Sequence, residues 1–230
     1  MQLVIMIILA LACCFFANAH LTCREDGEYK KSLVMKALAS ACFVAAGGIA
    51  VTGCWYTRFG YLTLGGLCFG LFGDVLLGLR YMYPKKKETF FAAGGACFAA
   101  GHVLYVIALT GLTPKVMYFA APYVLLGFVL AHNYLKKRGV KVKKLIFPGG
   151  LYELLVLFMG GCAVGAAVFA LSPGTILFAV AGVFFAMSDN MLAAEQFGSA
   201  KSADRRRGLS ILYYSAQIFI AFSLILLFVI

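Results

Sequence analysis

Residues 60–79 read GYLTLGGLCFGLFGDVLLGL, twenty consecutive residues that contain one charged side chain, Asp74. At roughly 1.5 Å of rise per residue, a helix of this length crosses the hydrocarbon core of a bilayer, which is about 30 Å thick. The run is too long, and too uniformly apolar, for the ten-residue alternating strands of a membrane barrel. The stretch therefore predicts a transmembrane helix that carries a carboxyl group.

Similar apolar runs recur along the whole chain. Of its 230 residues, 63% are hydrophobic and 13% are charged, whereas a soluble domain is roughly half apolar and about a quarter charged. So much apolar surface requires lipid as the solvent. We predict an all-α polytopic membrane bundle with about eight transmembrane helices in a single membrane domain over residues 1–230. The expected spans are 2–19, 32–53, 60–79, 89–109, 114–132, 149–170, 173–195 and 208–230.

The basic residues are distributed unequally between the predicted loops. The chain has a net charge of +11. Its first, third, fifth and seventh loops hold seventeen Lys and Arg residues, against two in the other three loops. Under the positive-inside rule the odd-numbered loops face the cytoplasm and both termini lie outside. We therefore expect an integral, multi-pass protein of the bacterial cell membrane, whose basic loops face anionic lipid rather than nucleic acid.

The first span has a second interpretation. Ala17-Asn18-Ala19 follows an apolar run and resembles a signal-peptidase site. A signal peptide would have Lys or Arg before that run, and none is present. Retention of the span also agrees with the distribution of loop charge.

An internal repeat relates the third and seventh spans. Residues 69–77 and 184–192 both contain an aromatic residue, then Asp five positions later, then two large apolar residues after one intervening position. The two spans cross in the same direction, which predicts two four-helix halves related by an axis along the membrane normal. Chance similarity between apolar helices is the alternative explanation.

The two aspartates of this repeat are the strongest candidates for chemistry. An ionisable residue near the bilayer centre costs at least about 2.5–3.5 kcal/mol, so it faces the bundle and usually has a function. Asp74 and Asp189 lie at similar depths toward the cytoplasmic side, where they could share one cavity. Two carboxylates do not both ionise easily in low dielectric, so the pair would suit a general acid beside a stabilising carboxylate. The equally weighted alternative is that each bonds to a Lys, Ser or Tyr of a neighbouring helix.

Other polar residues in the spans could assist. His102 lies deeper than the aspartates and shares a helix face with Tyr105, where it could polarise water or contact a long substrate. Lys36 could hold a lipid phosphate, or simply extend its ammonium group to the interface. Further candidates for substrate contacts are Asn190, Glu153, Tyr213 and Gln217. The cysteines and histidines are too scattered to predict a metal site, and we expect no organic cofactor.

Four segments, in this order, resemble the YhhN-like lysoplasmalogenase family of multi-pass membrane proteins. They are Met35-Lys36-Ala37-Leu38, Gly73-Asp74-Val75-Leu76-Leu77, Gly101-His102-Val103-Leu104-Tyr105 and Ser188-Asp189-Asn190. The likeness covers nearly the whole chain in length, number of spans and order of motifs. The family usually has Lys-Pro-Leu in the second span, so Ala37 departs from the pattern while the lysine is retained.

The resemblance implies hydrolysis of the vinyl ether bond of a lysoplasmalogen, a one-chain lysophospholipid taken from the bilayer. The reaction starts with proton transfer to carbon and passes through an oxocarbenium ion, so it needs an acid, a carboxylate and a water, as in glycosidases. Asp74 and Asp189 would supply the first two, in an order that the sequence does not assign. His102, Tyr105 or Asn190 would position the water, and Lys36 would hold the phosphate.

Two other classes of function fit the same residues. Paired intramembrane carboxylates and a histidine also form proton relays, and two-half architectures are common among carriers, so a lipid or proton-coupled transporter is the main alternative. A carrier would place its polar residues near the midplane, whereas most of these lie in the cytoplasmic half. A lipid-binding scaffold with structural aspartates is the third possibility.

Overall fold

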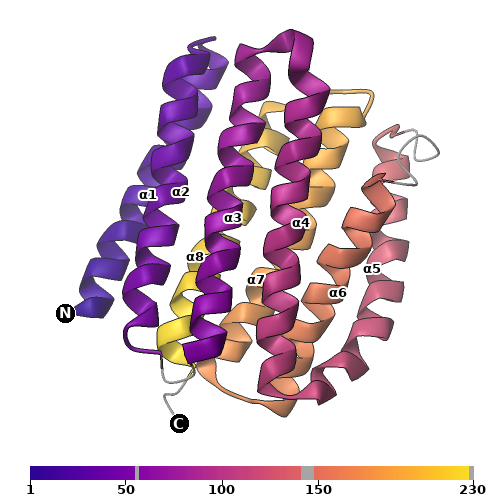
Figure 1. The fold of residues 1–230 in the computed structure, drawn as a ribbon. Coiled ribbons are helices and arrows are strands. Elements are labelled where there is room, and N and C mark those ends of the chain that lie inside the picture. The colour runs from indigo at the N-terminus through magenta and orange to yellow at the C-terminus, as the bar shows by residue number, and fades with distance from the viewer. Residues whose placement is uncertain (55–56, 141–147, 228–230) are drawn as a thin grey trace.

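A computed structural model describes residues 1–54, 57–140 and 148–227 (Figure 1). Within these ranges the chain is helical throughout, with eight helices long and apolar enough to cross a membrane and no strand. The predicted helical membrane bundle is thus confirmed. The helices are α1 (Gln2–Glu25), α2 (Tyr29–Val51), α3 (Thr57–Met82), α4 (Lys87–Leu112), α5 (Met117–Lys137), α6 (Pro148–Phe169), α7 (Pro173–Phe197) and α8 (Ala203–Leu226).

Most helices extend beyond the predicted spans, because helical structure continues into the polar interface after the apolar run ends. The helix α1 runs to Glu25 instead of residue 19, and α5 runs to Lys137 instead of 132. The predicted start of the fifth span, at 114, coincides with the start of the apolar segment Pro114–Lys137, whose first three residues form a 3-10 turn before α5. The helix α8 starts at Ala203 instead of 208, where the Ser202 side chain accepts a hydrogen bond from the Arg205 backbone. The predicted end of the eighth span, at 230, lies outside the described residues.

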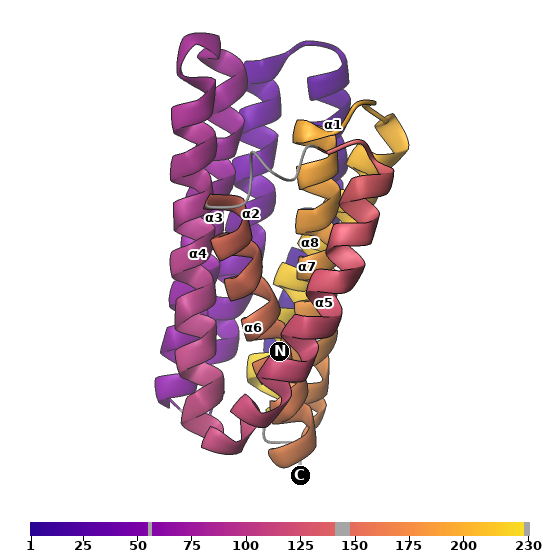
Figure 2. The same ribbon diagram turned by 90° about the vertical axis from the view of Figure 1, so that its right-hand side faces the viewer.

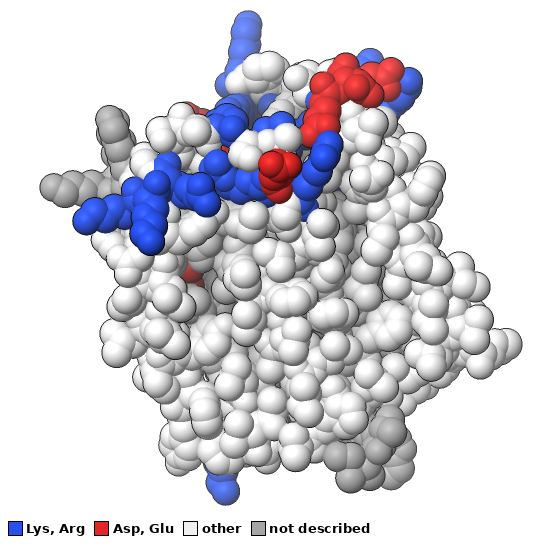
Figure 3. Space-filling model, turned by 180° about the vertical axis from the view of Figure 1, so that it is seen from behind, with Lys and Arg blue, Asp and Glu red and all other residues white. Residues whose placement is uncertain are grey.

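The helices run alternately up and down, so the start of α1 and the end of α8 lie at one end of the bundle (Figures 1 and 2). The α1–α2, α3–α4 and α7–α8 connections lie at the other end. Figure 3 shows Lys and Arg side chains crowded at the end with these three connections, above a broad and largely uncharged belt. We call this the basic end. The charge asymmetry read from the loops is therefore present in three dimensions, whereas the side of the membrane that the basic end faces stays a prediction.

The packing of helices repeats between α1–α4 and α5–α8. Consecutive helices pack against each other within each half, and between the halves α2 packs on α8 while α6 packs on α4. If α1–α4 correspond in order to α5–α8, then α2 corresponds to α6 and α4 to α8, so these two inter-half contacts are equivalent. This pattern agrees with the predicted pair of four-helix halves, and it places α3 and α7 in corresponding positions.

Glycines on α3 let neighbouring helices bring large side chains close to its backbone. The ring of Tyr105 on α4 lies directly over Gly66, and the Gln217 amide on α8 lies over Gly70, where an added Cβ would meet Nε2 at 2.5 Å. Small residues at such contacts are typical of membrane helix packing. Here they clear the space in which polar side chains from α4 and α8 reach α3.

Candidate active site

A cavity of about 260 Å³ opens near the basic end between α1–α4, α7 and α8. Asp74 of α3 and Asp189 of α7 both line it. Each aspartate lies eight residues before the last residue of its helix, or roughly 12 Å along the axis. The corresponding positions of α3 and α7 in the two halves thus bring both carboxyl groups to the same cavity at the same depth.

Asp74 is 1% exposed and accepts bonds from three side chains. Its Oδ2 accepts hydrogen bonds from Ser40 Oγ at 2.6 Å and from Tyr213 OH at 2.7 Å. Its Oδ1 forms an ion pair with Lys36 Nζ at 2.8 Å. An ionised carboxylate only accepts hydrogen bonds, and these short, charge-assisted contacts match that form.

A chain of hydrogen bonds leads from Asp74 into the middle of the bundle. Tyr213 OH accepts from Gln217 Nε2 at 3.0 Å. Gln217 Oε1 in turn accepts from Tyr105 OH at a long 3.4 Å. Every donor in this chain points toward Asp74, so the predicted residues Tyr105, Gln217 and Tyr213 form one connected group with it.

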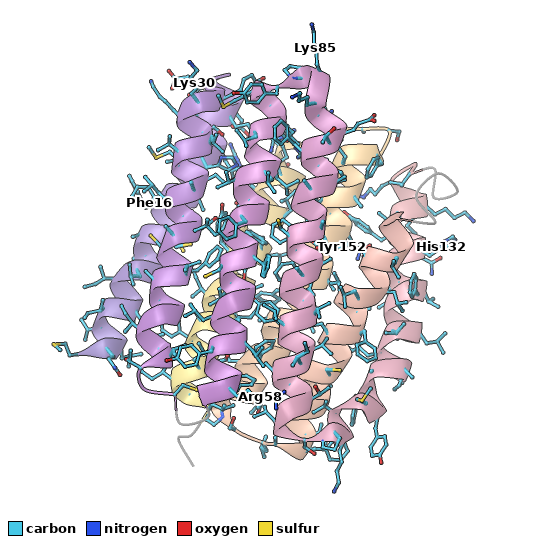
Figure 4. The ribbon with its side chains drawn as sticks, in the orientation of Figure 1. Phe16, Lys30, Arg58, Lys85, His132 and Tyr152 are labelled. Atoms are coloured by element: carbon cyan, nitrogen blue, oxygen red, sulfur yellow. The ribbon has the colours of Figure 1, made fainter. Side chains whose placement is uncertain are left out.

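Asp189 has different neighbours. Its Oδ2 accepts one hydrogen bond, from Tyr152 OH at 2.7 Å, and no Lys or Arg lies within 4.0 Å of it in the described part of the chain. Tyr152 comes from α6, which faces α4 and α7 in the bundle (Figure 4). One cavity therefore contains one carboxyl group held by an ammonium group and two hydroxyls, and one held by a single phenol.

His102 does not line the cavity. It is 1% exposed and packs edge-on against Phe185, with 4.5 Å between ring centroids. The rings of Tyr105 and Tyr152 each lie 6.0 Å away. Among the residues that the structure describes, neither ring nitrogen has a hydrogen-bond partner. His102 therefore lies between the two polar groups without a hydrogen bond to either.

Two further predicted residues form a separate pair. Asn190 Nδ2 donates to Glu153 Oε1 at 2.9 Å, between α7 and α6. Neither residue lines the cavity. Four of the nine predicted site residues line the cavity: Lys36, Asp74, Asp189 and Tyr213. Two more, Tyr105 and Gln217, are connected to it through hydrogen bonds. The other three, His102, Glu153 and Asn190, lie outside it.

The sequence prediction missed the partners Ser40 and Tyr152 and the cavity residue Arg80. Ser40 lies four residues after Lys36, a spacing that places both on one helix face. Tyr152 directly precedes Glu153, and the sequence prediction selected the charged residue of the two. Arg80 is one of the seventeen basic residues that the sequence assigns to the odd-numbered loops, although it lies inside α3 and is 5% exposed.

Comparison with protein families finds a match to the model of the YhhN family over residues 31–224. All four segments that carry the resemblance, and both aspartates, lie inside the matched range. No curated protein and no solved structure matches the chain.

Proposed function

Because the chain belongs to the YhhN family, we propose that it is a membrane-embedded hydrolase that cleaves the vinyl ether bond of lysoplasmalogens. The products are a fatty aldehyde and a glycerophospho-ethanolamine or -choline. One observation carries the proposal: Asp74 and Asp189 line one cavity with different bonding partners. Carboxyl groups in unlike surroundings can divide the roles of acid and ion stabiliser.

We assign the acid to Asp189 and the stabilising carboxylate to Asp74. Asp189 has one donor and no cation within 4.0 Å among the described side chains, so it is the better carrier of a proton. Asp74 is bonded to Lys36, Ser40 and Tyr213, which suits a permanent anion. The negative charge of Asp74 would face the oxocarbenium ion as it forms.

The reaction balances with these two groups and one water. The Asp189 carboxyl transfers its proton to the outer alkene carbon, whose π electrons form the new C–H bond. Water then adds to the oxocarbenium carbon and returns a proton to Asp189. The hemiacetal breaks its C–O bond to the glycerol oxygen, which takes a proton and leaves as the alcohol, while the carbon becomes the aldehyde.

The depth of the cavity supports a lysolipid substrate. The aspartates lie roughly 12 Å from the ends of α3 and α7. With those helix ends at the interface, this depth would match the glycerol and the first chain atoms of a lipid. A vinyl ether occupies that level when the head group is at the interface. The basic end, with its excess of Lys and Arg, suits the phosphate of the head group.

The direct test is aldehyde release by the purified protein in detergent. The substrate is 1-alkenyl lysophosphatidylethanolamine, and the control is the 1-alkyl ether lipid, which has no double bond to protonate. We expect fatty aldehyde from the alkenyl lipid alone. Absence of aldehyde with several head groups, from protein that is demonstrably folded, would overturn the proposal.

A proton-coupled lipid transporter is the second candidate, favoured by the hydrogen-bond chain from Tyr105 through Gln217 and Tyr213 to Asp74. The unpartnered His102 lies beside the inner end of this chain. A transporter would move lysolipid across proteoliposome membranes in response to a pH gradient, without producing aldehyde. A hydrolase would release aldehyde in detergent, where no gradient exists.

A further inference from the structure

Arg80 is a buried cation with unused donors. It is 5% exposed and lines the cavity on the outer side of the aspartates. Its guanidinium packs on the rings of Tyr81 and Phe91, at 4.8 and 5.2 Å from their centroids, and Nη2 donates to Tyr81 OH at 2.7 Å. Nε and Nη1 have no hydrogen-bond partner among the described residues. A buried cation with unpaired donors is costly in free energy unless an anion accepts their hydrogen bonds.

Arg24 of α1 lies beside the same ring. Its guanidinium carbon is 4.5 Å from the centroid of Tyr81, and it also lines the cavity. In the described part of the chain no carboxylate lies within 4.0 Å of Arg24 or Arg80. Two guanidinium groups therefore converge on Tyr81 without a counterion.

Of the other cations that line the cavity, Lys87 is exposed and the remaining three have partners. Lys36 pairs with Asp74 at 2.8 Å, and Arg206 pairs with Glu195 at 3.0 Å. The ammonium group of Lys201 donates to the carbonyls of Glu195 and Gln196. The carboxylates of Asp74 and Glu195 are thus engaged by cations other than Arg24 and Arg80. Asp189 forms no ion pair among the described side chains, so the two arginines remain for an external anion.

We propose that Arg80, assisted by Arg24, binds the phosphate of the lysophospholipid substrate. This inference rests on the proposed function and replaces Lys36 as the phosphate ligand. Guanidinium groups are planar, always charged and well suited to phosphate oxygens. Lys36, in its ion pair, serves to hold Asp74 instead.

The spacing along α3 agrees with one lipid reaching both sites. Arg80 lies six residues after Asp74, or roughly 9 Å along the helix axis. In a 1-alkenyl lysophospholipid, seven bonds separate the phosphorus from the alkene carbon that takes the proton. An extended chain advances roughly 1.2 Å per bond, as the backbone does, which amounts to roughly 8 Å. Phosphate at Arg80 would therefore place the vinyl ether near the carboxyl groups.

The test measures binding of non-cleavable 1-alkyl lysophosphatidylethanolamine to the full-length protein by calorimetry in detergent. We expect Arg80→Gln to raise Kd about tenfold or more, because it removes a charge-assisted bond to phosphate. Lys85→Gln is the matched control. Lys85 projects from the basic end outside the cavity (Figure 4), and its loss should change Kd less than twofold.

A phosphate-free 1-alkylglycerol separates the phosphate contact from damage to the fold. Arg80→Gln should leave its Kd unchanged. An equal loss for both ligands, or no loss for the lysophospholipid, would overturn the proposal. If Arg80→Gln does not fold, Arg80→Lys and Arg24→Gln provide the same comparison, with a smaller expected rise in Kd for the phosphate-bearing lipid alone.

Inorganic phosphate distinguishes the two sources of the anion. Displacement of the lysolipid by millimolar phosphate from the wild type would mean that the site accepts free phosphate. No displacement would mean that it takes phosphate only on a lipid. Because the ligand cannot be cleaved, binding is readable even if the protein releases no aldehyde, so failure of the proposed reaction and failure of the phosphate site give different results.

Discussion

Asp74 and Asp189 occupy equivalent positions in the two halves of the bundle and line the same cavity, but only Asp74 is paired with a cation. The difference arises from the neighbouring helices. At Asp74, α2 supplies Lys36 and α8 supplies Tyr213. At Asp189, the corresponding helix α6 supplies Tyr152 alone. Helices in corresponding positions thus surround the two carboxyl groups with different partners.

The two halves also differ one helical turn deeper than the aspartates, where Gln217 in one half corresponds to His102 in the other. His102 and Gln217 are 115 positions apart, as are Asp74 and Asp189, and Gly70 and Phe185. Gly70 leaves room for the Gln217 amide, which donates a hydrogen bond to Tyr213, the residue that in turn donates to Asp74. Beside Phe185 the His102 ring packs against an aromatic face and makes no hydrogen bond within the described residues.

Replacing either aspartate by asparagine should abolish most turnover while preserving lipid binding. Asp189→Asn removes the proton donor and Asp74→Asn removes the stabilising charge, and each should lower the rate of aldehyde release by about 10² or more. The measurement is initial rate, with Kd for the 1-alkyl lipid taken in parallel. Glu88→Gln, at the exposed start of α4, is the control. Full activity in both aspartate variants would exclude the mechanism.

Lys36→Met should destabilise the protein strongly, although methionine and lysine side chains are similar in length. It leaves Asp74, which is 1% exposed, without its ammonium partner, and breaking a buried pair costs about 3 kcal/mol or more. The double variant Lys36→Met with Asp74→Asn should recover part of that loss, because no unpaired charge is left. Thermal unfolding in one detergent measures both. Additive losses would mean that the ion pair contributes nothing specific.

Tyr152→Phe should slow aldehyde release by about tenfold, because Asp189 loses its only hydrogen-bond donor among the described residues and the carboxylate left after proton transfer is less stabilised. Stability should fall little, since the ring is retained. Tyr118→Phe is a matched control, because Tyr118 is exposed on α5. Equal rates in wild type and Tyr152→Phe would argue against Asp189 as the acid.

Gly70→Ala should lower stability and activity together. The added Cβ would lie 2.5 Å from Gln217 Nε2 and would displace the amide from its bond to Tyr213, at a cost of about 1–3 kcal/mol for overpacking. Gly48→Ala is the control, since an added Cβ there meets nothing within 4 Å. It should be neutral or slightly stabilising, because alanine favours helix more than glycine does. Equal melting temperatures for the two variants would contradict this packing.

The predicted orientation can be tested with reporter fusions in a bacterial host. A reporter that is active only outside the cytoplasm should work when fused at the C-terminus or at the α4–α5 turn, and fail when placed in the α3–α4 loop. The expectation follows from the excess of Lys and Arg in the odd-numbered loops. The opposite pattern of activity would invert the topology and put the cavity at the other face.

The amino-acid sequence is enough to predict the membrane class, the eight helices and the relative depth of the polar residues. These properties follow from one-dimensional quantities, because apolar length and the rise per residue relate position in the chain to position across the bilayer. It also identified Asp74 and Asp189, since a carboxyl group inside an apolar run stands out from its neighbours. The predicted end of the eighth span, at 230, and residues 141–147 between α5 and α6 lie outside the described residues.

Which side chains meet becomes known once the helices are packed together. From the sequence, Lys36 could hold a lipid phosphate or extend to the interface, and its ion pair with Asp74 appears only once α2 packs on α3. Arg80 looked like a loop charge until the fold buried it without a carboxylate among the described residues. Depth is set by the chain itself, whereas the direction a side chain faces and the helix it meets depend on packing between elements far apart in sequence.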